Sequence, residues 1–312
     1  MKKLITIMLI MISDVCFSQT WPTQPVRVIV PSAVGSGPDL QARYIAERLK
    51  ARWNQPVLIE NIPGPSGLAG VSEFVKNKGS NHVLLHTFFS TVVSNDFLIK
   101  NMPYNYKTDL EPIIQISDVE MIWSVPANSK VMNMQDLINL SRTRDVFVAV
   151  TSKWVAQHTA LELLNLQAGT NITPVLHKSA ALAGTSLLSE SVDVLIDTVS
   201  TSSGYAKSGR SRVIAVSTAR RSVQWPQVPT VGETLPGYVL APWNAMFANK
   251  GMPKEIISQV NRDVNEILSD RTVPQTIFES VQGGTPEKLA QQIEKDRVSF
   301  ARLVKKFNLQ PE

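Results

Sequence analysis

Hydroxyl and glycine residues gather in one loop near the start of the chain, between an apolar segment and a helical pattern. Its polar or flexible members are Ser32, Gly35, Ser36, Gly37 and Asp39. Glycines let backbone N–H groups turn toward one point, and a helix N-terminus adds positive potential there, so such a loop can bind an anion. Asp39 fits as the N-cap of the following helix. A plain strand-to-helix turn would use the same residues, and the pattern alone leaves both interpretations open.

Two phosphate sites and one nucleophile site are excluded by the spacing. After Gly35 and Gly37 the third glycine of a dinucleotide fingerprint is missing, and no Gly-Lys-Ser/Thr follows. A second glycine loop, residues 61–67, lacks the Gly-x-Ser-x-Gly elbow that would make Ser66 a hydrolase nucleophile. Neither loop therefore predicts nucleotide binding or covalent catalysis.

The four histidines do not form a recognisable catalytic or metal-binding set. His82 and His86 have the spacing of a helical metal pair, but their segment reads as a strand and no third ligand accompanies them. His158 opens a helix and His177 ends a strand, so each could donate a hydrogen bond to a carboxylate. The single cysteine is Cys16, which lies in the leader described next. We therefore expect no catalytic residue, no metal and no cofactor.

Residues 1–18 have the pattern of a secretory signal peptide. A basic start and an apolar run over residues 4–12 precede small residues at a cleavage site after Ser18. The run is shorter than the roughly 20 residues that span a bilayer. Acylation at Cys16 is disfavoured because Asp14, two residues before it, puts a charge where the peptidase requires a small apolar side chain. The expected product is a soluble periplasmic protein without disulfides, held together by its core.

The remaining composition favours a small anionic ligand. The formal net charge is +5, yet no basic block of the kind that binds nucleic acid occurs. We therefore expect no nucleic-acid partner.

Short β-rich runs alternate with helical patterns along the mature chain. The predicted strands are 26–30, 57–60, 83–86, 113–116, 121–125, 146–150, 174–177, 192–196 and 213–216. The predicted helices are 40–53, 67–77, 135–142, 157–167 and 180–189, followed by two amphipathic helices near the C-terminus. Such alternation predicts an α/β fold with mainly parallel, helix-covered sheets, and ligands of such folds bind beyond the carboxyl ends of the strands.

Several segments in fixed order resemble the periplasmic receptors of the tripartite tricarboxylate transporters, called Bug receptors. The matching segments are 21–31, 35–39, 55–61, 63–64, 84–85, 103–104, 228–231, 235–238, 251–253 and 284–287, with Asp109 and Trp243. They cover nearly the whole mature chain. The resemblance implies a two-lobed periplasmic binding protein of the Venus-flytrap type that acts as a monomer. Its partners would be a small carboxylate ligand and the membrane subunits of a transporter, or a sensor ectodomain.

The resemblance also implies which loops hold the carboxylate. The first is the Ser32–Asp39 loop; the second would run from Thr151 to His158, with further contacts after two later strands. The residues implied beyond the first loop are Thr151, Ser152, Trp154, Gln157, His158, His177, Lys178 and Asp197. Lys178 could neutralise a second anionic group, or it could be an ordinary surface lysine.

This sequence departs from the family pattern at the site itself. An aromatic residue is usual where Ser32 stands, and the usual glycine- and hydroxyl-rich second loop keeps only His158. The departures leave open a receptor with an unusual ligand, and an orphan receptor with lost binding that acts in sensing. An enzyme on the same fold, a hydrolase or isomerase, would need His158 and Asp197 within hydrogen-bond reach. We predict one lobe from 21–118 and 243–312 and a second from 119–242.

Overall fold

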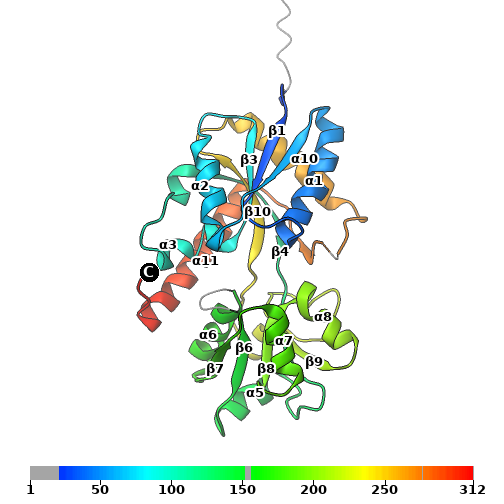
Figure 1. The fold of residues 1–312 in the computed structure, drawn as a ribbon, viewed down its shortest axis with the longest axis vertical. Helices are drawn as coiled ribbons and strands as arrows, with labels where there is room; N and C mark the ends of the chain where they lie inside the picture. The colour runs from blue at the N-terminus through cyan, green and yellow to red at the C-terminus, as the bar shows by residue number, and fades with distance from the viewer. Residues whose placement is uncertain (1–20, 152–155, 276, 312) are drawn as a thin grey trace, which may run out of the picture.

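The structure, a computed structural model, describes residues 21–151, 156–275 and 277–311. The predicted signal peptide and the predicted contacts Ser152 and Trp154 lie outside the described residues. Those residues fold into two lobes, one above the other in Figure 1, each built on its own sheet. The predicted two-lobed α/β fold is confirmed.

The first lobe holds a sheet with strand order β11-β4-β10-β3-β1-β2. Its strands are β1 (Val26–Val30), β2 (Val57–Asn61), β3 (Val83–Phe88), β4 (Leu110–Asp118), β10 (Trp243–Asn249) and β11 (Ser280–Val281). Its helices are α1 (Gly37–Trp53), α2 (Leu68–Lys76), α3 (Asn95–Leu98), α4 (Tyr106–Asp109), α10 (Lys254–Ser269) and α11 (Pro286–Phe307), with single 3₁₀ turns at η1 (Pro65–Gly67) and η2 (Phe89–Thr91).

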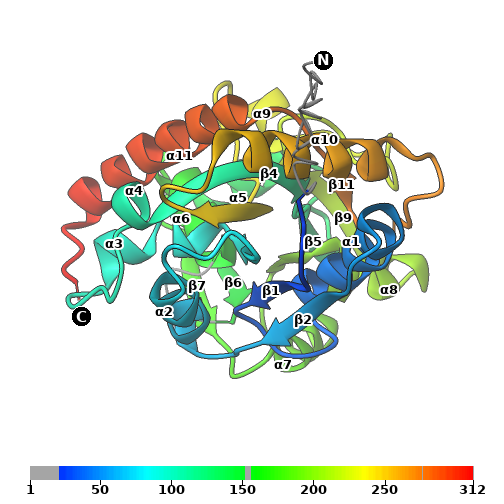
Figure 2. The same ribbon diagram turned by 90° about the horizontal axis from the view of Figure 1, so that it is seen from above.

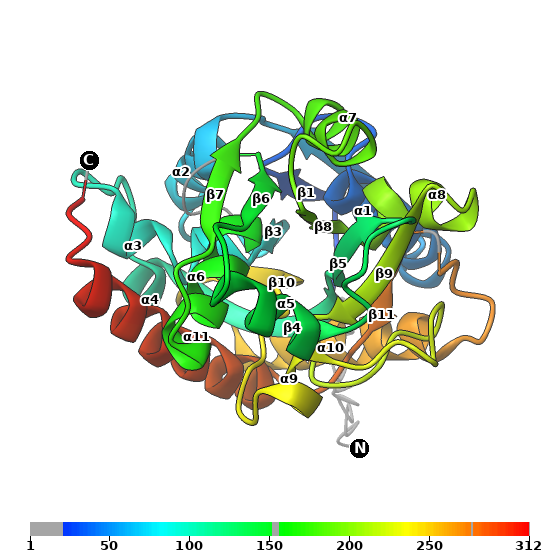
Figure 3. The ribbon, with the colours of Figure 1, turned by 90° about the horizontal axis from the view of Figure 1, so that it is seen from below.

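The second lobe holds a sheet with strand order β7-β6-β8-β5-β9. Its strands are β5 (Met121–Pro126), β6 (Phe147–Val150), β7 (Thr173–Leu176), β8 (Val194–Thr198) and β9 (Ser211–Val216). Its helices are α5 (Met134–Ser141), α6 (Ala156–Ala168), α7 (Ala180–Leu188), α8 (Val199–Lys207) and α9 (Val231–Thr234). Figure 3 shows α5 and α6 on one side of this sheet and α7 on the other.

Both sheets are mixed and not mainly parallel as expected from the sequence, because the chain crosses between the lobes twice. Strand β4 ends at the junction and β5 starts there, so β5 runs antiparallel to its neighbours β8 and β9. Strand β10 re-enters the first lobe from the junction and runs antiparallel to β3 and β4. The strands β1, β2 and β3 remain parallel to one another, as do β6, β7 and β8. Their carboxyl ends consequently face the other lobe.

Helices cover both faces of each sheet, which explains why most strands are continuously apolar. In the first lobe, Val28 of β1 faces the core under α1 and α10, whereas Ile29 faces the core shared with α2 and α11. In the second lobe, Trp123 of β5 packs in the core with α5 and α6, and Leu195 of β8 packs beneath α7. All four side chains are at most 2% exposed.

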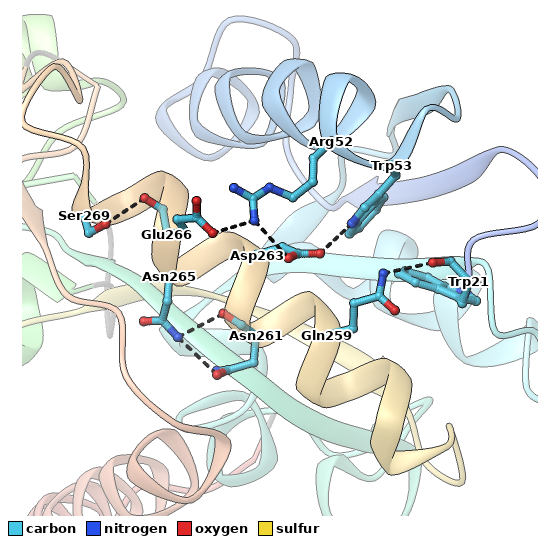
Figure 4. A network of polar contacts seen from close by, with 9 residues as sticks. All are labelled: Trp21, Arg52, Trp53, Gln259, Asn261, Asp263, Asn265, Glu266 and Ser269. Carbon is cyan, nitrogen blue, oxygen red and sulfur yellow. Dashed lines mark hydrogen bonds and ion pairs between the residues drawn. The ribbon is translucent and has the colours of Figure 1, made fainter.

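A polar network joins the two chain ends that build the first lobe. Figure 4 shows it between α1 and α10. Trp53 Nε1 donates to Asp263 at 2.7 Å, and Arg52 Nη1 lies 2.5 Å from Glu266 and 3.2 Å from Asp263. Gln259 Nε2 also donates to the carbonyl of Trp21 at 2.9 Å. These contacts fix the C-terminal segment onto the lobe that the N-terminal segment begins.

The lobes are joined by more than the two chain crossings. Val119 N donates to Pro242 O at 2.6 Å, which ties the crossings to each other. The carboxylate of Glu279, next to β11, accepts from Glu120 N at 2.7 Å and from Ser200 N, in the first turn of α8, at 2.9 Å. On another side, Leu163 and Leu166 of α6 pack against the first-lobe core that contains α11. The edge of the first-lobe sheet and the core around its C-terminal helix thus both contact the second lobe.

Carboxyl groups crowd this junction, and Asp118 at the end of β4 is the clearest case. Burial raises the pKa of Asp118 to about 7, and the negative charges of Asp296 and Glu120 act in the same direction. The amides of Gln115 and Gln282 donate to its two oxygens at 2.6 and 2.8 Å, which only partly offsets this effect. Asp118 therefore takes up a proton on folding near pH 5.

We predict that Asp118→Asn makes the free energy of unfolding less dependent on pH. The pKa is about 3.9 in the unfolded chain and about 7 in the folded one, so the stability that Asp118 contributes is lost as pH rises through that window. Relative to the parent, the variant should therefore gain about 2–3 kcal/mol of unfolding free energy between pH 5 and pH 8. Urea unfolding at both pH values measures this.

The exposed Asp145→Asn serves as the control and should follow the parent curve. Equal pH dependence in the parent and Asp118→Asn would contradict the prediction.

Candidate ligand-binding cleft

A cavity of about 1230 Å³ lies between the lobes. Its first-lobe wall consists of the loops that follow β1, β2 and β3, contributed by residues 31–33, 63–68 and 88–90 among others. The second lobe contributes the first turn of α6, and the junction contributes Val119 and the segment around Pro242. The cavity therefore occupies the position expected from the topology, beyond the carboxyl ends of parallel strands.

The first predicted loop reaches the cavity through Ser32. Ser32 is half-buried, lines the cavity, and shares a hydrogen bond of 2.8 Å with the hydroxyl of Ser36. Ser36 is also the N-cap residue of α1, so the expectation that Asp39 would cap this helix is wrong. Helix α1 begins two residues before Asp39 because Gly37 and Pro38 already adopt helical backbone geometry.

Asp39 instead turns back to fix the shape of the loop. It is 1% exposed, and it accepts from Gly35 N at 2.8 Å and from Asn61 Nδ2 at 2.9 Å. Arg43 Nε lies 3.0 Å from the same carboxylate. Burial alone would raise the pKa of Asp39, but the hydrogen bonds from Arg43, Gly35 and Asn61 outweigh it and lower the pKa. The Gly35 N–H expected to bind the ligand thus already has a carboxylate of the chain itself.

The loops that follow β2 and β3 are held in place by close packing of the backbone. Asn95 Nδ2 donates to Ser66 O at 2.9 Å, which joins the loop after β3 to the loop after β2. Gly67 has φ +74°, and a Cβ there would lie 2.8 Å from the ring of Phe88. Gly70 in α2 lies so close to Pro31 that a Cβ would meet its Cα at 2.7 Å. These contacts bring the three loops together on one wall.

His158 and Thr159 bring the second lobe to the cavity. His158 is 5% exposed, lines the cavity in the first turn of α6, and its Nε2 lies 3.4 Å from the carboxylate of Glu162. Burial raises the pKa of Glu162. Of the predicted contacts that the structure describes, Ser32 and His158 are the two that line this cavity.

Asp197 serves the second lobe's own structure. It is 3% exposed, and it accepts from Ser202 Oγ at 2.7 Å and from Thr198 N at 2.8 Å. Burial raises the pKa of Asp197, although a hydrogen bond from Gln157 opposes this. His158 thus has the carboxylate of Glu162 as a partner, and Asp197 has the hydroxyl of Ser202 in α8.

The remaining predicted contacts lie away from the cavity lining. Lys178 is exposed, and the His177 ring is 2.9 Å from the carbonyl of Val175 in its own segment. Gly35, Gly37 and Thr151 likewise do not belong to the lining residues. A role for any of these in a closed form stays a prediction.

Sequence reasoning missed the third wall of the cavity. The cavity is also lined by Phe88 at the end of β3, by Phe89, Leu98 and Ile99 after it, and by Leu309 after the C-terminal helix. The available signal was positional: 83–86 was predicted as a strand, and the loop after a third parallel strand belongs to the same sheet edge.

The described residues offer little for metal chemistry. Across residues 21–151, 156–275 and 277–311, no group of three or more His, Cys, Asp or Glu is placed to hold a metal ion. His86 is fully buried in β3, and burial lowers its pKa to about 4, which keeps the ring neutral. In the same ranges no helix has the length and apolar character of a membrane span.

Comparison with known proteins assigns the family. A model described as the tripartite tricarboxylate transporter family receptor matches residues 41–295. A UPF0065 protein of Bordetella bronchiseptica is 32% identical over 298 residues, which are 94% of this chain and 89% of that protein. This chain belongs to the tripartite tricarboxylate transporter receptor family. Protein BugT of Bordetella pertussis is 29% identical over 86% of this chain and 83% of its own.

Solved structures of similar receptors share the fold. R. palustris Rpa4515, solved with adipate, has a TM-score of 0.78 and 29% identity over 94% of this chain and 100% of its own. The periplasmic binding protein BugD has a TM-score of 0.73 and 25% identity over 94% of this chain and 100% of its own. The family and these relatives are solute-binding receptors.

We predict that Gly70→Ala destabilises the receptor by about 1–3 kcal/mol. The added Cβ would meet the backbone of Pro31 at 2.7 Å and the carbonyl of Ile62 at 2.9 Å, and neither can move without disturbing the cavity wall. Chemical denaturation measures the loss.

Gly204→Ala in α8 is the matched control, because a Cβ there has open space within 4 Å. This second helical glycine should gain about 0.5–1 kcal/mol from the alanine. Equal effects at the two positions would show that packing against Pro31 does not matter.

Proposed function

We propose that this protein is a periplasmic receptor that captures a small carboxylate-containing ligand between its lobes for a tripartite tricarboxylate-type transporter. The observation that carries the proposal is the cavity between the lobes, lined by Ser32 from one and His158 from the other. The match to the receptor family and the relative solved with adipate support it. Export would use the signal peptide, with cleavage near Ser18.

The polar groups at the cavity can bind a carboxylate without a metal or cofactor. The Ser32 hydroxyl can donate to a carboxylate oxygen when it releases its contact with Ser36. His158 can donate from its ring, and the first turn of α6 adds the positive end of a helix dipole. Hydrogen bonds to an ionised group are about twice as strong as neutral ones, so a few donors are enough to orient the ligand.

Capture would proceed by closure about the junction. We propose that residues 21–118 with 243–312, and residues 119–242, move as two bodies about the crossings at Val119 and Pro242. The ligand must bind the closed form more tightly, with each tenfold shift in population requiring about 1.4 kcal/mol. Thr151, Gln157, His177 and Lys178 belong to the lobe that would approach the ligand. The closed pair of lobes would then present one surface to the transporter's membrane subunits.

The test is a thermal-shift panel of mono-, di- and tricarboxylates on the mature chain, followed by calorimetry. A bound acid at a hundredfold excess over its Kd should add about 2.7 kcal/mol of stability. Ser32→Ala and His158→Ala should each weaken the best ligand about tenfold or more, because each removes a donor to a charged group.

The exposed Ser208→Ala is the control and should leave affinity unchanged. A folded parent that binds no acid in the panel would contradict the proposal and favour an orphan receptor.

A further inference from the structure

One wall of the cavity carries a row of apolar side chains that are only partly covered, with the polar Ser90 and Ser94 among them. Phe88, Phe89, Leu98, Ile99 and Leu309 are all half-buried and all line the cavity. They come from the stretch that runs from the end of β3 to just past α3 and from the chain end after α11, and Figures 1 and 2 show α3 beside the C-terminus. When an apolar ligand displaces water from such a surface, the burial of apolar area favours binding.

Part of this wall is fixed by packing, so it cannot fold away. The ring of Phe89 packs edge-on to Trp243 with centroids 5.9 Å apart, and Trp243 is fully buried with its Nε1 donating to Asp296. Phe88 lies against Gly67, where even a Cβ would not fit. The wall is therefore a preformed surface.

The described lining carries almost no charge. Among the residues that line the cavity in the described part of the chain, none is Lys, Arg, Asp or Glu, and His158 is the one ionisable side chain. Lys100 follows Ile99 but is exposed and outside the lining, and Arg297 pairs with Asp96 at 2.9 Å behind α3. A second carboxylate held against this described part of the lining would thus lose its water without gaining a cationic partner there.

We infer that the ligand is a monocarboxylate whose body is an apolar chain or ring, not a di- or tricarboxylate. This inference rests on the proposed function and narrows its substrate class. The single carboxylate meets the polar groups at Ser32 and His158, and the apolar body lies along Phe88, Phe89 and Ile99. The uncharged wall discriminates against a second carboxylate on the ligand. Burying an unpaired charge there costs more free energy than burying a methyl group contributes.

The test compares octanoate with octanedioate, which share a carbon chain and differ in the second carboxylate. At neutral pH octanoate should bind at least about tenfold more tightly, because octanedioate must bury an unpaired charge against the wall. Calorimetry on the mature chain measures both Kd values, with adipate as a third ligand.

A charge placed in the wall should reverse this preference. Ile99 lines the cavity and, among the described residues, lies outside the packed core clusters, so Ile99→Lys can fold. The variant should bind octanoate more weakly and octanedioate more tightly. The Kd of octanedioate divided by that of octanoate should therefore fall about tenfold or more. Val223→Lys, at a valine that is 67% exposed, makes the same kind of change elsewhere and should keep the parent's ratio.

The outcomes separate the inference from the function beneath it. Octanedioate or adipate binding as tightly as octanoate would overturn the inference and leave a working carboxylate receptor. An unchanged ratio in Ile99→Lys would show that the wall does not face the ligand and would also overturn it. If none of the three acids binds, and no acid in the thermal-shift panel of carboxylates stabilises the protein, the proposed function itself is contradicted.

Discussion

The hydrogen bond from Val119 N to Pro242 O, at 2.6 Å, joins the two places where the chain passes between lobes. Because the chain leaves the first lobe through β4 and returns through β10, these neighbouring strands run in opposite directions. That constraint makes both sheets mixed and leaves β1, β2 and β3 pointing their carboxyl ends at the second lobe. The cavity lies beyond the carboxyl ends of β1, β2 and β3, where loops and α6 line the space and no strand of the described residues continues across it.

The same junction also gathers the carboxyl groups of Asp118, Glu120 and Glu279. Burial raises the pKa of each. The carboxylate of Glu279 accepts hydrogen bonds from the backbone N–H groups of Glu120 and Ser200. A side chain at the edge of the first sheet thereby fixes the first turn of α8 in the second lobe. Together with the α6 contact to the α11 side, this restrains the junction on two sides. Relative motion of the lobes has to disturb one contact or the other.

Sequence reasoning located the strands that are apolar on both faces, because their runs of Val, Ile and Leu admit few other structures. It missed β10, whose sequence Trp-Asn-Ala-Met-Phe-Ala-Asn mixes strand-favouring Trp and Phe with Asn and Ala, which are depleted in strands, and has no strict alternation. That strand forms because β3 and β4 flank it, which is a tertiary effect. The role of Asp39 was missed for a related reason: its partners Asn61 and Arg43 lie on different elements, and only the folded lobe brings them together.

The cavity divides its polar groups into those that hold the walls and those that remain for a ligand. Asp39 occupies the Gly35 N–H, and Asn95 donates its amide to Ser66, so both groups maintain loop shape and offer little outward. The described lining of the hollow includes the Ser32 hydroxyl, the first turn of α6 with His158 and Thr159, further serine and amide side chains, and a row of apolar side chains. The ligand that we infer, with one carboxylate and an apolar body, matches this surface. The scaffold that the chain shares with its relatives thus fixes where binding occurs, and the side chains left over after the loops are built determine what can bind.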